Sequence, residues 1–289
     1  MQTFPGTPKN NPLANFMRQP KIYINLPSKG EFWPPGSLDM PESGQLPVFS
    51  MTARDELLFK TPDALMNGQA IVDVIQSCIP NIKNAWTTPT IDLDTILIAI
   101  RLATYGERMP FKHKVPNAGE EVDYELDLRM LLDQQGQNYW LEQVAVSPDL
   151  VIFVKPLTYK HMTQANIKSF ETTRILSLAN DDTMPDEKKL ELFNQSFSNL
   201  TKVTVELLAE SVYKIHTPEA EVTNPVYIKE FFENADKDIF AKVQKHLNEL
   251  KVHNELKPLT FTATPEQIAA GAPETYQVPI NFNDADFFV

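Results

Sequence analysis

The spacing of hydrophobic residues changes twice along the 289-residue chain, and this limits the folds that the chain can adopt. Apolar residues recur at helical spacing from about residue 52 to 106, alternate with polar residues from 111 to 157, and return to helical spacing from 164 to 250. The pattern predicts an α+β fold. An N-terminal mixed region with short helices and a small antiparallel sheet is followed by a helical domain and an extended C-terminal tail.

The same changes divide the chain into four regions. These are an extended arm (1–20), an α+β domain (21–157), a helical domain (158–255) and an extended C-terminal tail (256–289). Nine of the 23 prolines lie in the first 50 residues, where they fix φ, remove hydrogen-bond donors and favour extended segments. Such segments either form stiff surface loops or lie on a partner, and both interpretations remain open.

Capping signals place helices in the α+β domain. Thr52 and Asp55 form a capping box ahead of a short helix. Asp92 is predicted to be the N-cap of a longer helix that runs to Gly106. Because this second helix is apolar almost all round, we expect it at the centre of the core.

The helical domain is expected to contain a helix from about Gln164 to Leu178 and a longer one that opens on the capping box Thr183–Asp186 and extends as far as Ile215. An apolar seam with spacings of three and four runs along the longer helix: Leu190, Phe193, Phe197, Leu200, Thr204 and Leu207. Packing within the same domain is the usual reason for such a seam. Packing against another chain is the alternative.

The charge balance argues against nucleic acid and membrane partners. The chain has 26 basic and 38 acidic residues, a formal charge of −12, which disfavours binding to polyanions and anionic membranes. No run of 18 apolar residues occurs, and the first 20 residues lack the apolar core of a signal peptide. We therefore expect no membrane insertion, and a protein that is made and used in a cytoplasm.

Sequence patterns for catalysis, cofactors and metals are missing. No phosphate-binding glycine loop or nucleophile elbow occurs, and the five histidines lack metal-ligand spacing. The single cysteine, Cys78, lies on the apolar side of a predicted helix and is expected to be a buried, inert thiol. The sequence therefore predicts no catalytic residues, no cofactor and no metal.

The segment from Lys114 to Glu120 has the spacing of a zinc knuckle without its ligands. Val115 and Ala118 occupy the positions where two cysteines would stand. Because zinc in such a knuckle needs thiolate ligands, no zinc site is expected here.

Several short motifs follow one another along the chain: Leu26–Gly30, Met51–Glu56, Asn67–Gly68, Ile98–Arg101, Tyr105–Gly106, Lys155–Thr158 and Asp286–Phe288. In order and spacing they resemble the baseplate hub and hub-assembly proteins of T4-like contractile-tailed phages, from about residue 21 to 289. The resemblance implies a non-enzymatic structural component of the baseplate hub that acts in assembly through contacts with other baseplate and hub proteins. It also implies a location in the virion tail baseplate, and in the host cytoplasm during assembly.

Three questions stay open at this stage. The chain could instead be a transient assembly chaperone that leaves before the virion is complete, and self-association is a further option. An enzyme with an unrecognised site is a third hypothesis, which would need a deep pocket with a desolvated carboxylate beside His113 or His161.

Three aromatic residues near the C-terminus are candidates for partner binding. Phe282, Phe287 and Phe288 stand among acidic and amide residues, and exposed aromatic side chains are costly unless they dock. Docking on the chain's own fold and docking on a neighbour are both possible.

Overall fold

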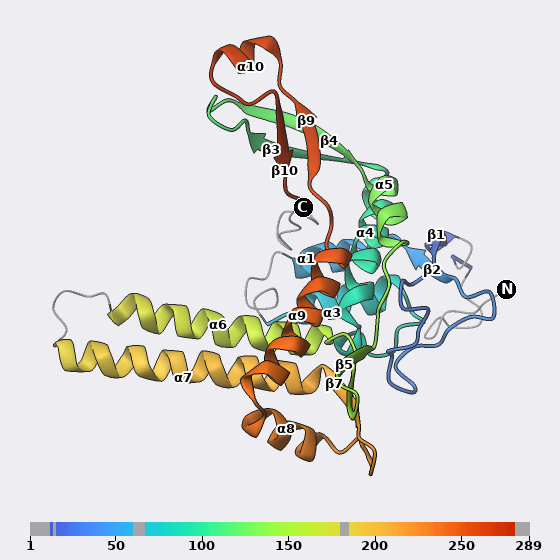
Figure 1. Cartoon of the computed structure of the whole chain (residues 1–289). Coiled ribbons are helices and arrows are strands. Elements are labelled where there is room, and N and C mark those ends of the chain that lie inside the picture. The colour runs from blue at the N-terminus through green and yellow to red at the C-terminus, as the bar shows by residue number, and fades with distance from the viewer. Residues whose placement is uncertain (1–11, 14–15, 60–66, 180–184, 281–289) are drawn as a thin grey trace.

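Helix α4 (Thr90–Tyr105) lies at the centre of the largest hydrophobic core in the computed structural model, which describes residues 12–13, 16–59, 67–179 and 185–280 (Figure 1). Twelve of its 16 residues are buried, which confirms the predicted central helix. The core also includes residues from elements that precede α4: β1 (Pro20–Ile24), β2 (Leu46–Phe49), α1 (Ala53–Leu58), α3 (Gln69–Cys78) and the short 3-10 helix η2 (Ala85–Thr87). The α+β class, with small antiparallel sheets, is confirmed.

The predicted capping box begins α1. The backbone N–H of Asp55 donates to the Thr52 hydroxyl, and the backbone N–H of Thr52 donates to the Asp55 carboxylate. Arg18 attaches the preceding segment to the same place, since its guanidinium donates to the carbonyl oxygens of Ser50 and Ser77 at 2.6 and 2.7 Å. The residues just ahead of β1 are therefore held against α1 and α3.

Asp92 does not cap α4, contrary to the prediction. The N-cap position is Pro89, and Asp92 lies fully buried in the first turn of the helix. Its carboxylate accepts hydrogen bonds from the backbone N–H and hydroxyl of Ser28 and from Nε1 of Trp33 at 2.8 Å. The local pattern assigned this carboxylate to the helix end, but donors from residues far away in the sequence bind it instead.

Two β-hairpins form a separate projection above the core in Figure 1. One pairs β3 (Arg108–Lys114) with β4 (Glu121–Asp127), and the other pairs β9 (Leu259–Thr262) with β10 (Thr275–Val278), with α10 (Pro265–Ala269) between them. Their shared core contains Tyr124 and Tyr276, whose hydroxyl groups are hydrogen-bonded. Val115 is buried in this core and Ala118 packs against it, so apolar contacts fill the knuckle where thiolates would bind a metal.

The third core surrounds a four-stranded antiparallel sheet of order β5–β6–β7–β8. The strands and their covering helices are β5 (Gln143–Ser147), β6 (Leu150–Val154), β7 (Val212–His216), β8 (Glu221–Val222), α8 (Pro225–Asn234) and α9 (Lys237–Asn254). The strands expected between 111 and 157 are thus divided between two sheets, and α5 (Leu128–Gln135) stands between them in the chain.

Helices α6 (Tyr159–Ala179) and α7 (Asp186–Glu210) pack side by side as a hairpin that projects from the body (Figure 1). The prediction that the second helix extends as far as Ile215 was wrong. The chain leaves the helix after Glu210, and Val212–His216 forms β7, because its β-branched and aromatic residues pair with β6. The first helix begins at Tyr159, earlier than Gln164, since the buried ring of Tyr159 stacks on Trp86.

Candidate functional site

Small polar side chains lie between the two helices of the projecting hairpin. Thr172 of α6 and Ser196 of α7 are buried, although the hairpin projects from the body (Figure 1). The Thr172 hydroxyl donates to the carbonyl oxygen of Lys168, one turn earlier. The burial of Thr172 and Ser196 therefore marks the faces on which α6 and α7 contact each other.

The predicted apolar seam of α7 lies beside this contact face. The side chains of Leu190 and Phe197 are each 63% exposed, and Phe193 is 36% exposed. Each of these residues directly follows a less exposed position: 189, 192 or 196. Adjacent residues of a helix point in different directions, so the seam lies to one side of the face that meets α6. The seam is therefore available to another chain, as the second interpretation of the sequence required.

The inner end of the seam leads into an apolar cavity at the foot of the hairpin. The cavity has a volume of about 520 Å³ and lies among α4, α6, α7 and α9. Thr204 and Leu207 of the seam line it, together with Trp140, Met162 and Leu247. Seam and cavity together form one surface, which we call the apolar strip, and which runs from the outer part of α7 into the body.

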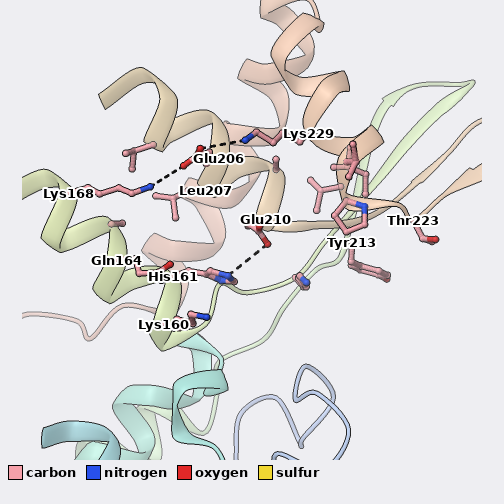
Figure 2. A pocket seen from close by; sticks show the side chains of 18 residues that line it. Lys160, His161, Gln164, Lys168, Glu206, Leu207, Glu210, Tyr213, Thr223 and Lys229 are labelled. Atoms are coloured by element: carbon pink, nitrogen blue, oxygen red, sulfur yellow. Dashed lines mark hydrogen bonds and ion pairs between the residues drawn. The ribbon is translucent and has the colours of Figure 1, made fainter. Parts of the chain in front are cut away.

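A second depression, which we call the cationic groove, lies between α6, α7 and α8 and has a volume of about 580 Å³ (Figure 2). Four lysines and two glutamates line it, so its formal charge is +2 when His161 is neutral, in a chain whose net charge is −12. The charged residues are Lys155, Lys160, Lys168, Lys229, Glu206 and Glu210. The apolar strip and the cationic groove thus adjoin at the base of the hairpin, where Lys155 and Leu207 line both.

His161 is at the inner end of the cationic groove. Its Nδ1 lies 3.1 Å from the Thr158 hydroxyl, and its Nε2 lies 3.8 Å from a Glu210 carboxylate oxygen. Burial lowers the pKa of His161 below its ordinary value, and the nearby Lys155 and Lys160 lower it further, while Glu210 opposes them. Both ammonium groups are therefore close enough to the imidazole to act on it electrostatically.

Glu206 joins three helices across the other end of the groove (Figure 2). Its carboxylate lies 3.1 Å from Nζ of Lys168 on α6 and 3.5 Å from Nζ of Lys229 on α8. The hydrogen bond from Lys168 is the largest cause of the pKa of Glu206 lying below its ordinary value. Glu206 therefore stabilises the docking of α8 against the hairpin through its ionised form.

Replacing Glu206 by glutamine is expected to lower the free energy of unfolding at pH 7 by less than about 1 kcal/mol, because half-exposed ion pairs are screened by solvent. A lowered pKa means that the contribution is present above the unfolded-state pKa and is lost as the pH falls through the pKa of the folded state. The difference between Glu206→Gln and wild type, measured by thermal unfolding, should vanish in acid. Glu191→Gln, on an exposed position of the same helix, should unfold like wild type both at pH 7 and in acid.

Of the residues that the sequence singled out, the structure describes Cys78 but not the three C-terminal phenylalanines. Phe282, Phe287 and Phe288 lie outside the described residues. Burial raises the pKa of the Cys78 thiol to about 12, so the thiol is protonated at neutral pH.

No cluster of three or more histidine, cysteine, aspartate or glutamate side chains that could hold a metal occurs within the described ranges. The helices of that same part of the chain include none long and apolar enough to cross a membrane.

Neither the apolar cavity nor the cationic groove could be found from local sequence. The groove combines α6 and α7 with α8, and the cavity combines α4 with α9, so each depends on the tertiary arrangement. The spacing of apolar residues along α7 was the one local signal, and it located the seam but not the cavity.

Comparison with known proteins relates this chain to one family. The family model described as T4 bacteriophage base plate protein matches residues 40–258, well over half of the chain. The match covers α1, the central helix, the whole α6–α7 hairpin and α9. No curated protein and no solved structure matches the chain.

Proposed function

The chain belongs to the T4 bacteriophage base plate protein family, and from this premise we propose that it is a structural component of the hub region of a contractile-tail baseplate. In this proposal it acts without catalysis, and its contacts with other baseplate and hub proteins help to assemble the baseplate. The virion tail baseplate is its final location, and the host cytoplasm is where assembly takes place.

The apolar strip is the observation that carries the proposal. Large apolar side chains that remain more than half exposed on a projecting helix are costly in water, and burying each against a partner contributes roughly 1.5–3 kcal/mol. The cavity at the inner end of the strip offers a concave apolar surface in which a partner side chain can be buried. An exposed seam that ends in a cavity is suited to holding another protein.

The side chains of the cationic groove support a non-enzymatic role over a hydrolase-like one. The groove does bring a histidine, His161, next to a carboxylate, Glu210. The Glu210 side chain is 55% exposed, however, and a general acid–base pair needs a desolvated carboxylate to adjust its pKa. His113 is the other histidine that could mark an enzyme site. It lies on β3, which pairs with β4, and does not line the groove.

A structural component and a transient assembly chaperone would use the same apolar strip and would differ only in retention. Quantitative mass spectrometry of purified virions and of baseplate assembly intermediates distinguishes them. We expect the chain in both samples, at a fixed ratio to a hub protein. Its presence in intermediates with loss from virions would identify a chaperone, and its absence from both samples would refute a baseplate role.

A further inference from the structure

We propose that the cationic groove binds the chain's own segment from Asn281 to Val289. This inference is independent of the baseplate role, because it concerns a contact within one copy of the chain. It also assigns a docking site to Phe282, Phe287 and Phe288.

The charges of the groove and of the segment are complementary. The segment contains Asp284 and Asp286 and no basic residue. Within the part of the chain that the structure describes, the ammonium groups of Lys155 and Lys160 line the groove and have no ion-pair partner, whereas Lys168 and Lys229 share Glu206. Two carboxylates placed beside Lys155 and Lys160 would balance the formal charge of +2.

The apolar part of the groove suits the aromatic side chains of the segment. Aliphatic side chains line the groove beside the charged ones, among them Val203, Leu207 and Val226. They come from α7 and α8, whereas Lys155 and Lys160 come from the start of α6 and the residues before it. A peptide with adjacent acidic and aromatic residues can therefore use both kinds of wall at once.

The residue that precedes the segment and the first turn of α6 both pack against the largest core cluster. Ile280, the last described residue before it, packs against the largest core cluster. Tyr159 and Met162, in the first turn of α6, belong to or pack against the same cluster, and Lys160 and His161 stand between them in the sequence. Nine extended residues span up to about 30 Å, and this length sets the region around Ile280 that the segment can sample in its own copy.

Photocrosslinking of the full chain tests the contact. A variant with Phe287→p-benzoylphenylalanine is irradiated and its crosslinked peptides are mapped by mass spectrometry. We expect crosslinks to α6, α7 or α8 at the groove. In a mixture of ¹⁵N-labelled and unlabelled protein, we expect both crosslinked peptides to carry the same label.

A charge variant decides whether the groove lysines hold the segment. Lys155→Ala combined with Lys160→Ala is expected to lower the crosslink yield roughly tenfold, the size expected for two exposed ion pairs. The control pair, Lys237→Ala and Lys245→Ala on α9, removes the same charge outside the groove and should leave the yield unchanged. An unchanged yield in the groove variant, crosslinks to other parts of the chain, or crosslinks between copies would each overturn the proposal.

Discussion

Replacing Asp92 by alanine should lower the free energy of unfolding by about 3–5 kcal/mol, the largest loss expected from any single substitution considered for this chain. The carboxylate is fully buried and accepts two hydrogen bonds from Ser28 and one from Trp33. Without it, the Ser28 N–H and hydroxyl and the Trp33 indole N–H are left buried and unpaired. Urea unfolding followed by circular dichroism measures the loss.

Two controls show whether the effect is specific to this buried contact. Asp73→Ala, on an exposed position of α3, should change stability by less than about 0.5 kcal/mol. Asp92→Asn retains an acceptor oxygen and the volume of the side chain, so its loss should fall between the two. Equal effects of Asp92→Ala and Asp73→Ala would refute the structural role of Asp92.

The pH dependence of the Asp92→Ala effect has a defined sign. Burial raises the pKa of Asp92 above its ordinary value, although the three donors oppose this. A raised pKa means that the group stabilises the fold most at low pH and loses this contribution as the pH rises through the pKa of the folded state. The stability difference between wild type and Asp92→Ala should therefore widen as the pH falls through the folded-state pKa of Asp92.

The second large effect concerns partner binding through the seam of α7. Phe193→Asp combined with Phe197→Asp is expected to weaken binding to a baseplate neighbour at least about a hundredfold, because two aromatic contacts are lost and two charges are placed against an apolar surface. Both side chains are partly or largely exposed, so the melting temperature should change little. Pulldown from a reconstituted baseplate mixture, combined with thermal unfolding, measures both quantities.

Phe170 provides a matched control on the same hairpin. It is 59% exposed and stands two residues before the buried Thr172 on α6, so it points away from α7 and its seam. Phe170→Asp should leave binding intact, and the reverse result would place the interface on α6. Sedimentation of the purified chain tests self-association, since a dimer that the seam variant converts to a monomer would identify the partner as a second copy.

Local sequence patterns predicted the elements and their class better than the contacts between them. The capping box at Thr52 was confirmed, because both of its hydrogen bonds form between residues three apart. Asp92 was assigned to a helix end for the same local reason, and the assignment was wrong because Ser28 and Trp33, about 60 residues away, supply its donors. Ile215 was placed on a helix because its apolar spacing continues that of α7, and only pairing with β6 makes it a strand residue.

The candidate site shows the same division between local and long-range information. The spacing from Leu190 to Leu207 depends on one helix, so the seam could be predicted. Which side of that helix meets α6 depends on packing, and the groove and cavity depend on α8 and α9. Whether the seam is buried within the chain or exposed could therefore not be decided from the sequence.

The pairing of β6 with β7 has a consequence for how the reach of this protein can evolve. These neighbouring strands fix both ends of the α6–α7 hairpin to one rigid base, and the helices between them, of 21 and 25 residues, extend roughly 35 Å. Whole turns can be inserted or deleted in both helices without altering strand register or the body. Such a change in length would move the outer end of the seam relative to the sheet and leave the contacts of the body as they are.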